Sequence, residues 1–171
     1  MNRRIGKALF VIMTAATLVL SAGWGAAASG GWRDQRDELV GTWLVTVQLN
    51  NCSGTALGAP FPSLLTFGSR GTMIEDTMNA SFAVGQRGTG HGVWDSAGWH
   101  KYSAKSVAFI NFTTTPPPPP GFTAGTQTIT QTIEFNEGPD RWTADAQVQF
   151  ADTTGAVYRS ACATATAVRF E

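Results

Sequence analysis

The sequence predicts an all-β protein, a single antiparallel up-and-down β-barrel of about eight strands. From residue 41 onward, apolar and polar residues alternate with a period of two, which is typical of strands that bury one face. Clusters of turn-forming residues separate these alternating runs. Eight short strands at this spacing favour a closed barrel over a sandwich, because closure removes the exposed edges of a sheet.

The expected strands, in order, are residues 41–49, 62–68, 71–78, 89–95, 98–113, 122–136, 141–151 and 156–170. The first and seventh show clear apolar faces, which should line the interior. The last carries alanine at every second position from Ala161 to Ala167, and such small residues leave room for a ligand inside or a covering element outside. Within 98–113, a bulge near Lys105 and Ser106 is expected to switch faces, because Val107 and Phe109 would otherwise point outward.

The N-terminus has the pattern of a secretory signal peptide. Arg3, Arg4 and Lys7 precede an apolar core at 8–20, and the small residues at 26–28 predict cleavage near Ala28. The expected domains are therefore a signal peptide at 1–28, a lead-in at 29–38 and the barrel at 39–171. The apolar core is shorter than the roughly 20 residues of a bilayer span, so no stable membrane anchor is expected after cleavage. These features predict a secreted or periplasmic protein.

Charge and proline content bear on the kinds of partner. Three of the twelve basic residues lie in the signal, which leaves nine against twelve acidic residues in the mature chain. This net charge of −3 gives no support for nucleic-acid binding, which needs a basic patch. The five prolines at 116–120 predict a stiff connection between two strands, with a docking role as the alternative.

The two cysteines, Cys52 and Cys162, are predicted to form a disulfide, since both lie in the mature part of an exported chain. Cys52 follows the first strand and Cys162 lies in the last. These strands are neighbours if the barrel closes, so the bond would join the two edges of the sheet where they meet.

Gly41-Thr42-Trp43 opens the first strand, and arginines lie on the last strand. Through these residues the chain resembles the calycin superfamily, which includes lipocalins and fatty-acid-binding proteins. The resemblance covers residues 39–171. The segment at 64–94 is similar to bacterial barrels related to allene oxide cyclases and lipocalin-like cyclases. The resemblance implies a lipocalin-like fold with an internal pocket. It also implies that Arg169 or Arg159 packs across Trp43. The Thr-Asp-Tyr motif of lipocalins is absent.

Glu75, Asp76 and Tyr102 are the candidate catalytic residues. Glu75 and Asp76 are adjacent on one strand, so one of them must face inward whatever the register. A carboxyl group in an apolar barrel is costly when charged, unless a cation or hydrogen-bond donors accompany it. Such a group would act as a general acid or as an anchor for a ligand. Alternatively, the inward carboxyl group is exposed to solvent at one end of the barrel, or it pairs with Arg70.

Inward polar and aromatic residues are the candidates for ligand binding. Gln131 shares a face with Ile129 and Ile133, so its amide must find a partner in a ligand, a water or a side chain such as Tyr102. The full set expected to bind a ligand is Trp43, Phe67, Glu75, Trp94, His100, Tyr102, Gln131 and Trp142. Neither His91 nor His100 lies at metal-ligand spacing, so we expect no metal and no cofactor.

Three functions are compatible with these patterns. The one we favour is an exported barrel that binds a small hydrophobic ligand in its interior. The second is a cyclase or isomerase acting on a hydrophobic substrate, with an inward carboxylate or Tyr102. The third is a structural or adhesive surface protein, which would need a filled barrel. The first two require a cavity, and the second also requires Glu75 or Asp76 to lie near Tyr102, His91 or Gln131.

Overall fold

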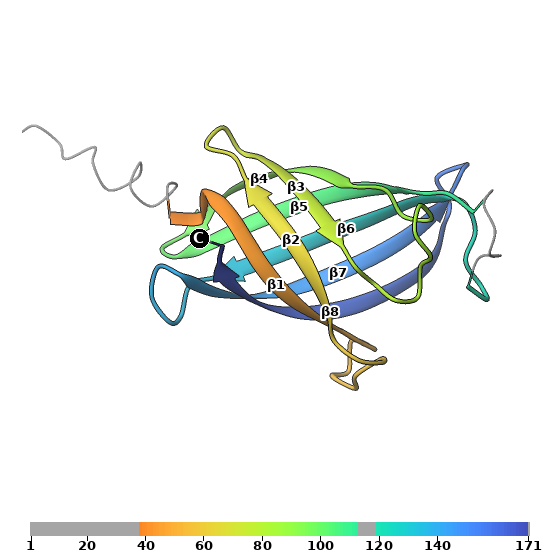
Figure 1. Cartoon of the computed structure of the whole chain (residues 1–171), viewed down its shortest axis with the longest axis horizontal. Coiled ribbons are helices and arrows are strands. Elements are labelled where there is room, and N and C mark those ends of the chain that lie inside the picture. The colour runs from red at the N-terminus through yellow and green to blue at the C-terminus, as the bar shows by residue number, and fades with distance from the viewer. Residues whose placement is uncertain (1–37, 113–118, 171) are drawn as a thin grey trace, which may run out of the picture.

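The computed structural model describes residues 38–112 and 119–170. The predicted signal peptide, most of the lead-in and most of the proline run lie outside the described residues. The described part is nearly all β and forms a closed barrel (Figure 1). The strands are β1 Gly41–Asn50, β2 Phe61–Phe67, β3 Thr72–Thr77, β4 Gly90–Gly98, β5 Lys101–Ile110, β6 Gly125–Glu134, β7 Arg141–Asp152 and β8 Val157–Arg169.

Each strand pairs antiparallel with the next along the chain, and β8 pairs with β1 to close the barrel. The predicted eight-stranded up-and-down barrel is therefore confirmed. Buried and exposed residues alternate along the strands, most regularly in β5 and β7. No helix in residues 38–112 and 119–170 is long and apolar enough to cross a membrane.

The predicted change of face near Lys105 and Ser106 is wrong. β5 pairs with β6 in one unbroken register from Lys101 to Ile110, so its side chains alternate without interruption. Val107 and Phe109 consequently point outward, and 76% of Phe109 is exposed. The register of β5 shifts instead on its β4 side, at the other end of that pairing, between Ser96 and Gly98.

The predicted disulfide between Cys52 and Cys162 is confirmed, with the two Cα atoms 4.9 Å apart. Asn50, the last residue of β1, pairs with Cys162 of β8, so Cys52 follows directly after the paired region. The side chain of Asn50 accepts a hydrogen bond from the backbone N–H of Cys52 at 2.9 Å. The bond therefore links the strands that close the barrel, at the end of β1 where the chain leaves the sheet.

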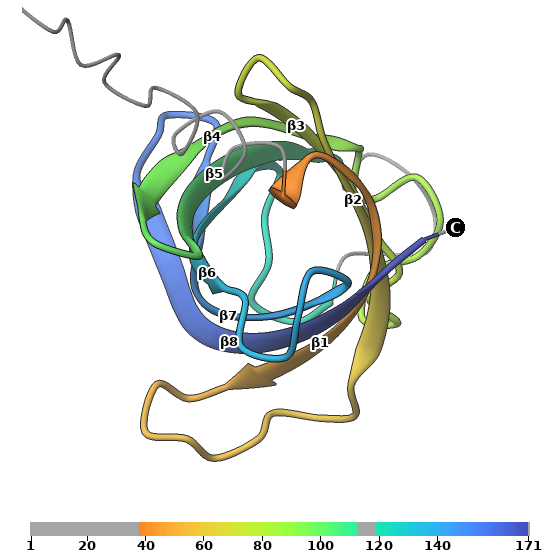
Figure 2. The same ribbon diagram turned by 90° about the vertical axis from the view of Figure 1, so that its left-hand side faces the viewer.

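One end of the barrel, here called the closed end, is filled with large side chains. Its buried members include Leu39, Trp43, Phe67, Trp94, Tyr102, Phe135 and Trp142. The segment just before β1 lies across this end in the axial view (Figure 2). Aromatic rings there meet edge to face, for example Trp43 against Phe135 with centroids 5.6 Å apart. Such offset contacts are the favoured packing of aromatic pairs.

Trp43 is fixed at the closed end by two contacts. Its indole N–H donates to the carbonyl of Leu39 at 2.9 Å. The guanidinium carbon of Arg169 lies 4.2 Å from the centroid of the Trp43 ring, which is cation–π geometry. Arg169 also donates to the carbonyls of Glu38 and Val40. Of the two arginines considered for this contact, Arg169 makes it, and Arg159 lies near the opposite end against Phe122.

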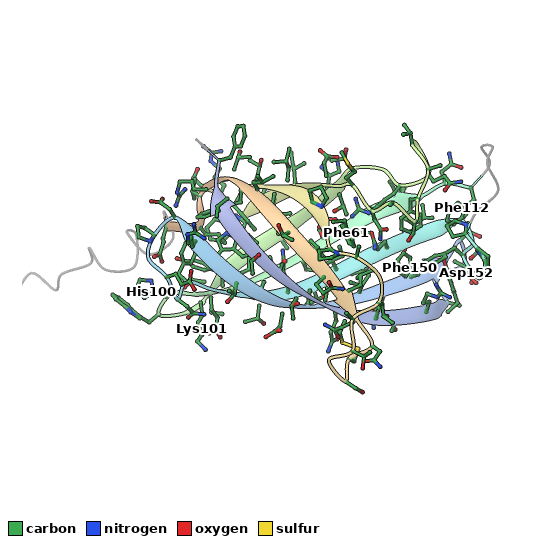
Figure 3. The ribbon with its side chains drawn as sticks, turned by 60° about the horizontal axis from the view of Figure 1, so that its bottom comes forward. Phe61, His100, Lys101, Phe112, Phe150 and Asp152 are labelled. Carbon is green, nitrogen blue, oxygen red and sulfur yellow. A yellow bond between two sulfur atoms is a disulfide. The ribbon has the colours of Figure 1, made fainter. Side chains whose placement is uncertain are left out.

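The opposite end, here called the aromatic end, is lined by rings from strands and connecting segments. Phe82, Phe112 and Phe122 come from the connections, and Phe150 and Tyr158 come from β7 and β8. Phe122 and Phe150 have centroids 4.9 Å apart and nearly perpendicular planes. His100 and Phe112 mark the two ends of the molecule (Figure 3).

Candidate functional site

A cavity of about 410 Å³ lies in the barrel between these two clusters. Most of its wall is apolar, with Val45, Val47, Leu65, Ile129, Val148 and Phe150 among the lining residues. Ala146 of β7 and the alternate alanines Ala161, Ala163 and Ala165 of β8 also line it. The small residues of the last strand therefore face inward and leave space inside the barrel. This volume falls within the roughly 300–1,000 Å³ of small-molecule pockets.

The cavity contains one buried ion pair, between Glu75 of β3 and Arg87 of the β3–β4 connection. Arg87 Nη2 donates to Glu75 Oε1, and the two side chains are only 5% and 3% exposed. Arg87 Nε donates to Gln127 Oε1 at 2.5 Å, and Ser106 Oγ donates to Glu75 Oε2 at 2.8 Å. The Glu75 carboxylate is thus neutralised by a cation and accepts hydrogen bonds on both oxygens, which a buried charge requires.

The local sequence makes room for this pair. Gly90 of β4 lies directly opposite Glu75 in the β3–β4 register. A Cβ atom at position 90 would lie 2.4 Å from Glu75 Cγ, so no other residue fits there without moving Glu75. Gly90 therefore allows the Glu75 side chain to lie inside the barrel.

Arg87 reaches the interior because its connection is tied to the end of β5. Arg87 forms a β-bridge with Ile110. On either side of it, Gly88 N–H donates to the carbonyl of Phe109, and the carbonyl of Gln86 accepts from Asn111. These backbone bonds fix the connection against the barrel wall and direct Arg87 toward Glu75.

The candidate catalytic residues lie in three separate places. Glu75 lines the cavity, whereas Asp76 points outward and accepts a hydrogen bond from Thr89 Oγ1 at 2.8 Å. Tyr102 lies at the closed end, where its hydroxyl donates to Glu38 Oε2 at 3.1 Å. His91 is exposed on the outer face of β4. Glu75 therefore forms hydrogen bonds with Arg87 and Ser106. The fold does not bring it together with Tyr102 or His91.

Of the eight residues expected to bind a ligand, Glu75 and Gln131 line the cavity. The aromatic five, Trp43, Phe67, Trp94, Tyr102 and Trp142, pack against one another at the closed end. His100 lies between β4 and β5, where its Nδ1 is 2.8 Å from Glu38 Oε2. Large rings pointing into a small barrel fill it where they gather, so the space remains where the inward residues are small.

Sequence reasoning missed most of the polar lining. Arg87 belongs to a connection without strand periodicity, so no pattern placed it inside the barrel. Gln127 shares the inward face of β6 with Gln131, four residues away, and that alternation was a usable signal. Within the described ranges, no group of three or more His, Cys, Asp or Glu residues is placed to hold a metal ion.

Tyr102 should resist ionisation. Burial raises the pKa of its hydroxyl above the ordinary value of 10.0, and the Glu38 carboxylate raises it further by its charge and its hydrogen bond. Because the folded chain keeps this proton more tightly than the unfolded chain, the contribution to stability is complete below pH 10.0. It is lost as the pH rises through the folded pKa.

In a Tyr158→Phe variant, Tyr102 is the one remaining tyrosine of the two in the chain. We expect its phenolate absorbance to appear only above pH 10.0 and together with loss of the folded circular dichroism signal. Ionisation near pH 10 in a still folded protein would contradict this assignment.

Compared with known proteins, the chain matches no protein-family model and no curated protein sequence.

Proposed function

We propose that this protein is an exported barrel that binds a small, largely apolar molecule in its interior. The observation that carries the proposal is the cavity of about 410 Å³, walled mainly by aliphatic and aromatic side chains. An apolar molecule gains free energy on entering such a cavity, roughly in proportion to the apolar area that it removes from water. The few polar groups in the wall would orient it.

Export is supported by the disulfide and by the N-terminal pattern. Disulfides form and persist in oxidising compartments and are rare in the cytosol. The Cys52–Cys162 bond fits such a compartment, as do the basic residues and apolar core at the N-terminus. Kinship with calycins is likewise a proposal, supported by the stacking of Arg169 on Trp43 that the resemblance implied.

Filling the cavity should abolish ligand binding. Ala163 of β8 lines the cavity and is 5% exposed, so Ala163→Phe places a ring inside it. We expect the wild type to bind N-phenyl-1-naphthylamine, an uncharged fluorophore, saturably and with one molecule per chain, and the variant to bind none. The variant should stay folded, because the ring enters the cavity and should cost no more than the roughly 1–3 kcal/mol of an enlarged core side chain.

Thr164→Phe is the matched control, since it adds the same ring to the next residue, which is exposed on the outer face. It should bind the fluorophore as the wild type does. The proposal fails if the wild type binds no fluorophore, or if Ala163→Phe binds it as well as Thr164→Phe does.

A further inference from the structure

Two glutamine side chains of β6 line the cavity, and both have unused hydrogen-bonding capacity. Gln127 and Gln131 are each 7% exposed. Gln127 accepts from Arg87 through Oε1, which leaves its amide nitrogen without a partner among the described residues. Gln131 hydrogen-bonds through its side chain with no residue in 38–112 or 119–170. The unpaired amide atoms are not fully buried, so they open into cavity space that a water molecule or a ligand can reach.

The neighbours of Gln131 explain why its amide stays free. In the sheet it lies between Ala104 of β5 and Ala146 of β7, whose methyl side chains offer no hydrogen bond. Gln131 is nearer the closed end than Gln127, which pairs with Phe150 near the aromatic end. Gln131 therefore presents one acceptor oxygen and one donor nitrogen to the inner part of the cavity.

Charge determines what kind of group fits beside these amides. Glu75 and Arg87 neutralise each other, and both oxygens of Glu75 already accept hydrogen bonds. In the inner part of the cavity, beside Gln131, a bound anion would lose its hydration and face Glu75 without a cation of its own, while a bound cation would find no free carboxylate. The remaining charged side chain in the lining, Arg159, stacks on Phe122 near the aromatic end.

We propose that the cavity selects an uncharged amphiphile, an apolar molecule with one neutral amide- or alcohol-type group that hydrogen-bonds with Gln131. This inference deepens the proposed function and rests on it. Gln131 is a specificity-determining residue in this assignment, and the Glu75–Arg87 pair is the neutral polar wall beside it. The apolar remainder of the ligand lies against the aliphatic and alanine lining.

The test uses four molecules with the same eight-carbon chain and different head groups: octanamide, octan-1-ol, octanoate and octylammonium. Each competes at neutral pH with N-phenyl-1-naphthylamine bound to the full protein. We expect the two uncharged molecules to displace the fluorophore at concentrations at least roughly tenfold lower than the two ions, because burying an unpaired charge is costly.

Gln131→Leu removes the amide and keeps a similar volume, and Gln131→Met serves as a second variant of the same length. In both, octanamide affinity should fall roughly tenfold, the effect of a lost hydrogen bond, while the affinity for the fluorophore stays within about twofold. Thr132→Leu changes the adjacent exposed residue and should leave the order of affinities unchanged.

Each result has one meaning. Equal displacement by all four head groups, tightest binding of either ion, or unchanged octanamide affinity in both Gln131 variants would overturn the assignment of an uncharged ligand. In all of these cases fluorophore binding would still support the proposed function. Failure of the wild type to bind the fluorophore would overturn the proposed function, and the inference with it.

Discussion

Arg87→Met is expected to lower the free energy of unfolding by about 3–5 kcal/mol, because it leaves the Glu75 carboxylate buried without its cation. The two side chains are only 5% and 3% exposed, so the carboxylate is shielded from bulk water. Urea denaturation followed by tryptophan fluorescence measures the change. The variant also removes the donor to Gln127 Oε1, which adds to the loss.

Two further variants test whether the loss comes from an uncompensated buried charge. Glu75→Leu combined with Arg87→Met removes both charges and should recover most of the lost stability, because an apolar replacement of a buried ion pair is often neutral. Lys101→Met breaks the exposed pair with Glu134, at 2.6 Å and 53% and 37% exposed, and should cost less than about 1 kcal/mol. A small loss for Arg87→Met, or no recovery in the double variant, would contradict the account.

Replacing both cysteines, Cys52→Ser with Cys162→Ser, is expected to lower the free energy of unfolding by about 4–5 kcal/mol, as the chain-entropy model gives for loops on the order of 100 residues. The cysteines are 110 residues apart, so in the unfolded chain the bond closes a loop that contains most of the barrel sequence. Because β1 and β8 close the barrel, the variant also weakens that pairing. Comparing the denaturation midpoints of oxidised protein, reduced protein and the double variant measures the effect.

Reduced wild type and the double serine variant should unfold at similar denaturant concentrations, both well below the oxidised protein. The serine variant controls for effects of the reductant itself. If the free energies of unfolding of the oxidised protein and the serine variant differed by less than about 1 kcal/mol, the disulfide would not stabilise the barrel as assigned here.

The fold was largely predictable because apolar and polar residues alternate along most of the strands. β7 alternates buried and exposed side chains over most of its length, and its neighbours β6 and β8 follow from the turns between them. The disulfide followed from the same topology, since β1 and β8 must meet if eight strands close. Position 107 shows where pattern reading fails, because a valine and a nearby phenylalanine on the outer face imitate a change of face.

The site was only partly predictable, for physical reasons that particular residues illustrate. Glu75 and Gln131 were found because an inward polar residue on a strand stands out against its apolar neighbours. Which inward aromatic residues fill the barrel and which line a cavity depends on packing in three dimensions. Trp43 and Trp142, for instance, meet each other with centroids 5.9 Å apart. Arg87 was not predicted because the position of a connection depends on backbone hydrogen bonds to residues distant in sequence, such as the one between Gly88 and Phe109.

Native mass spectrometry of the protein purified from its own host tests most directly whether the cavity holds a small molecule. We expect the wild type to carry a noncovalent adduct that is uncharged in free solution, and Ala163→Phe, with its filled cavity, to carry none. Thr164→Phe should retain the adduct. Identical spectra for the wild type and Ala163→Phe, with or without an adduct, would contradict the proposal that the barrel interior is the binding site.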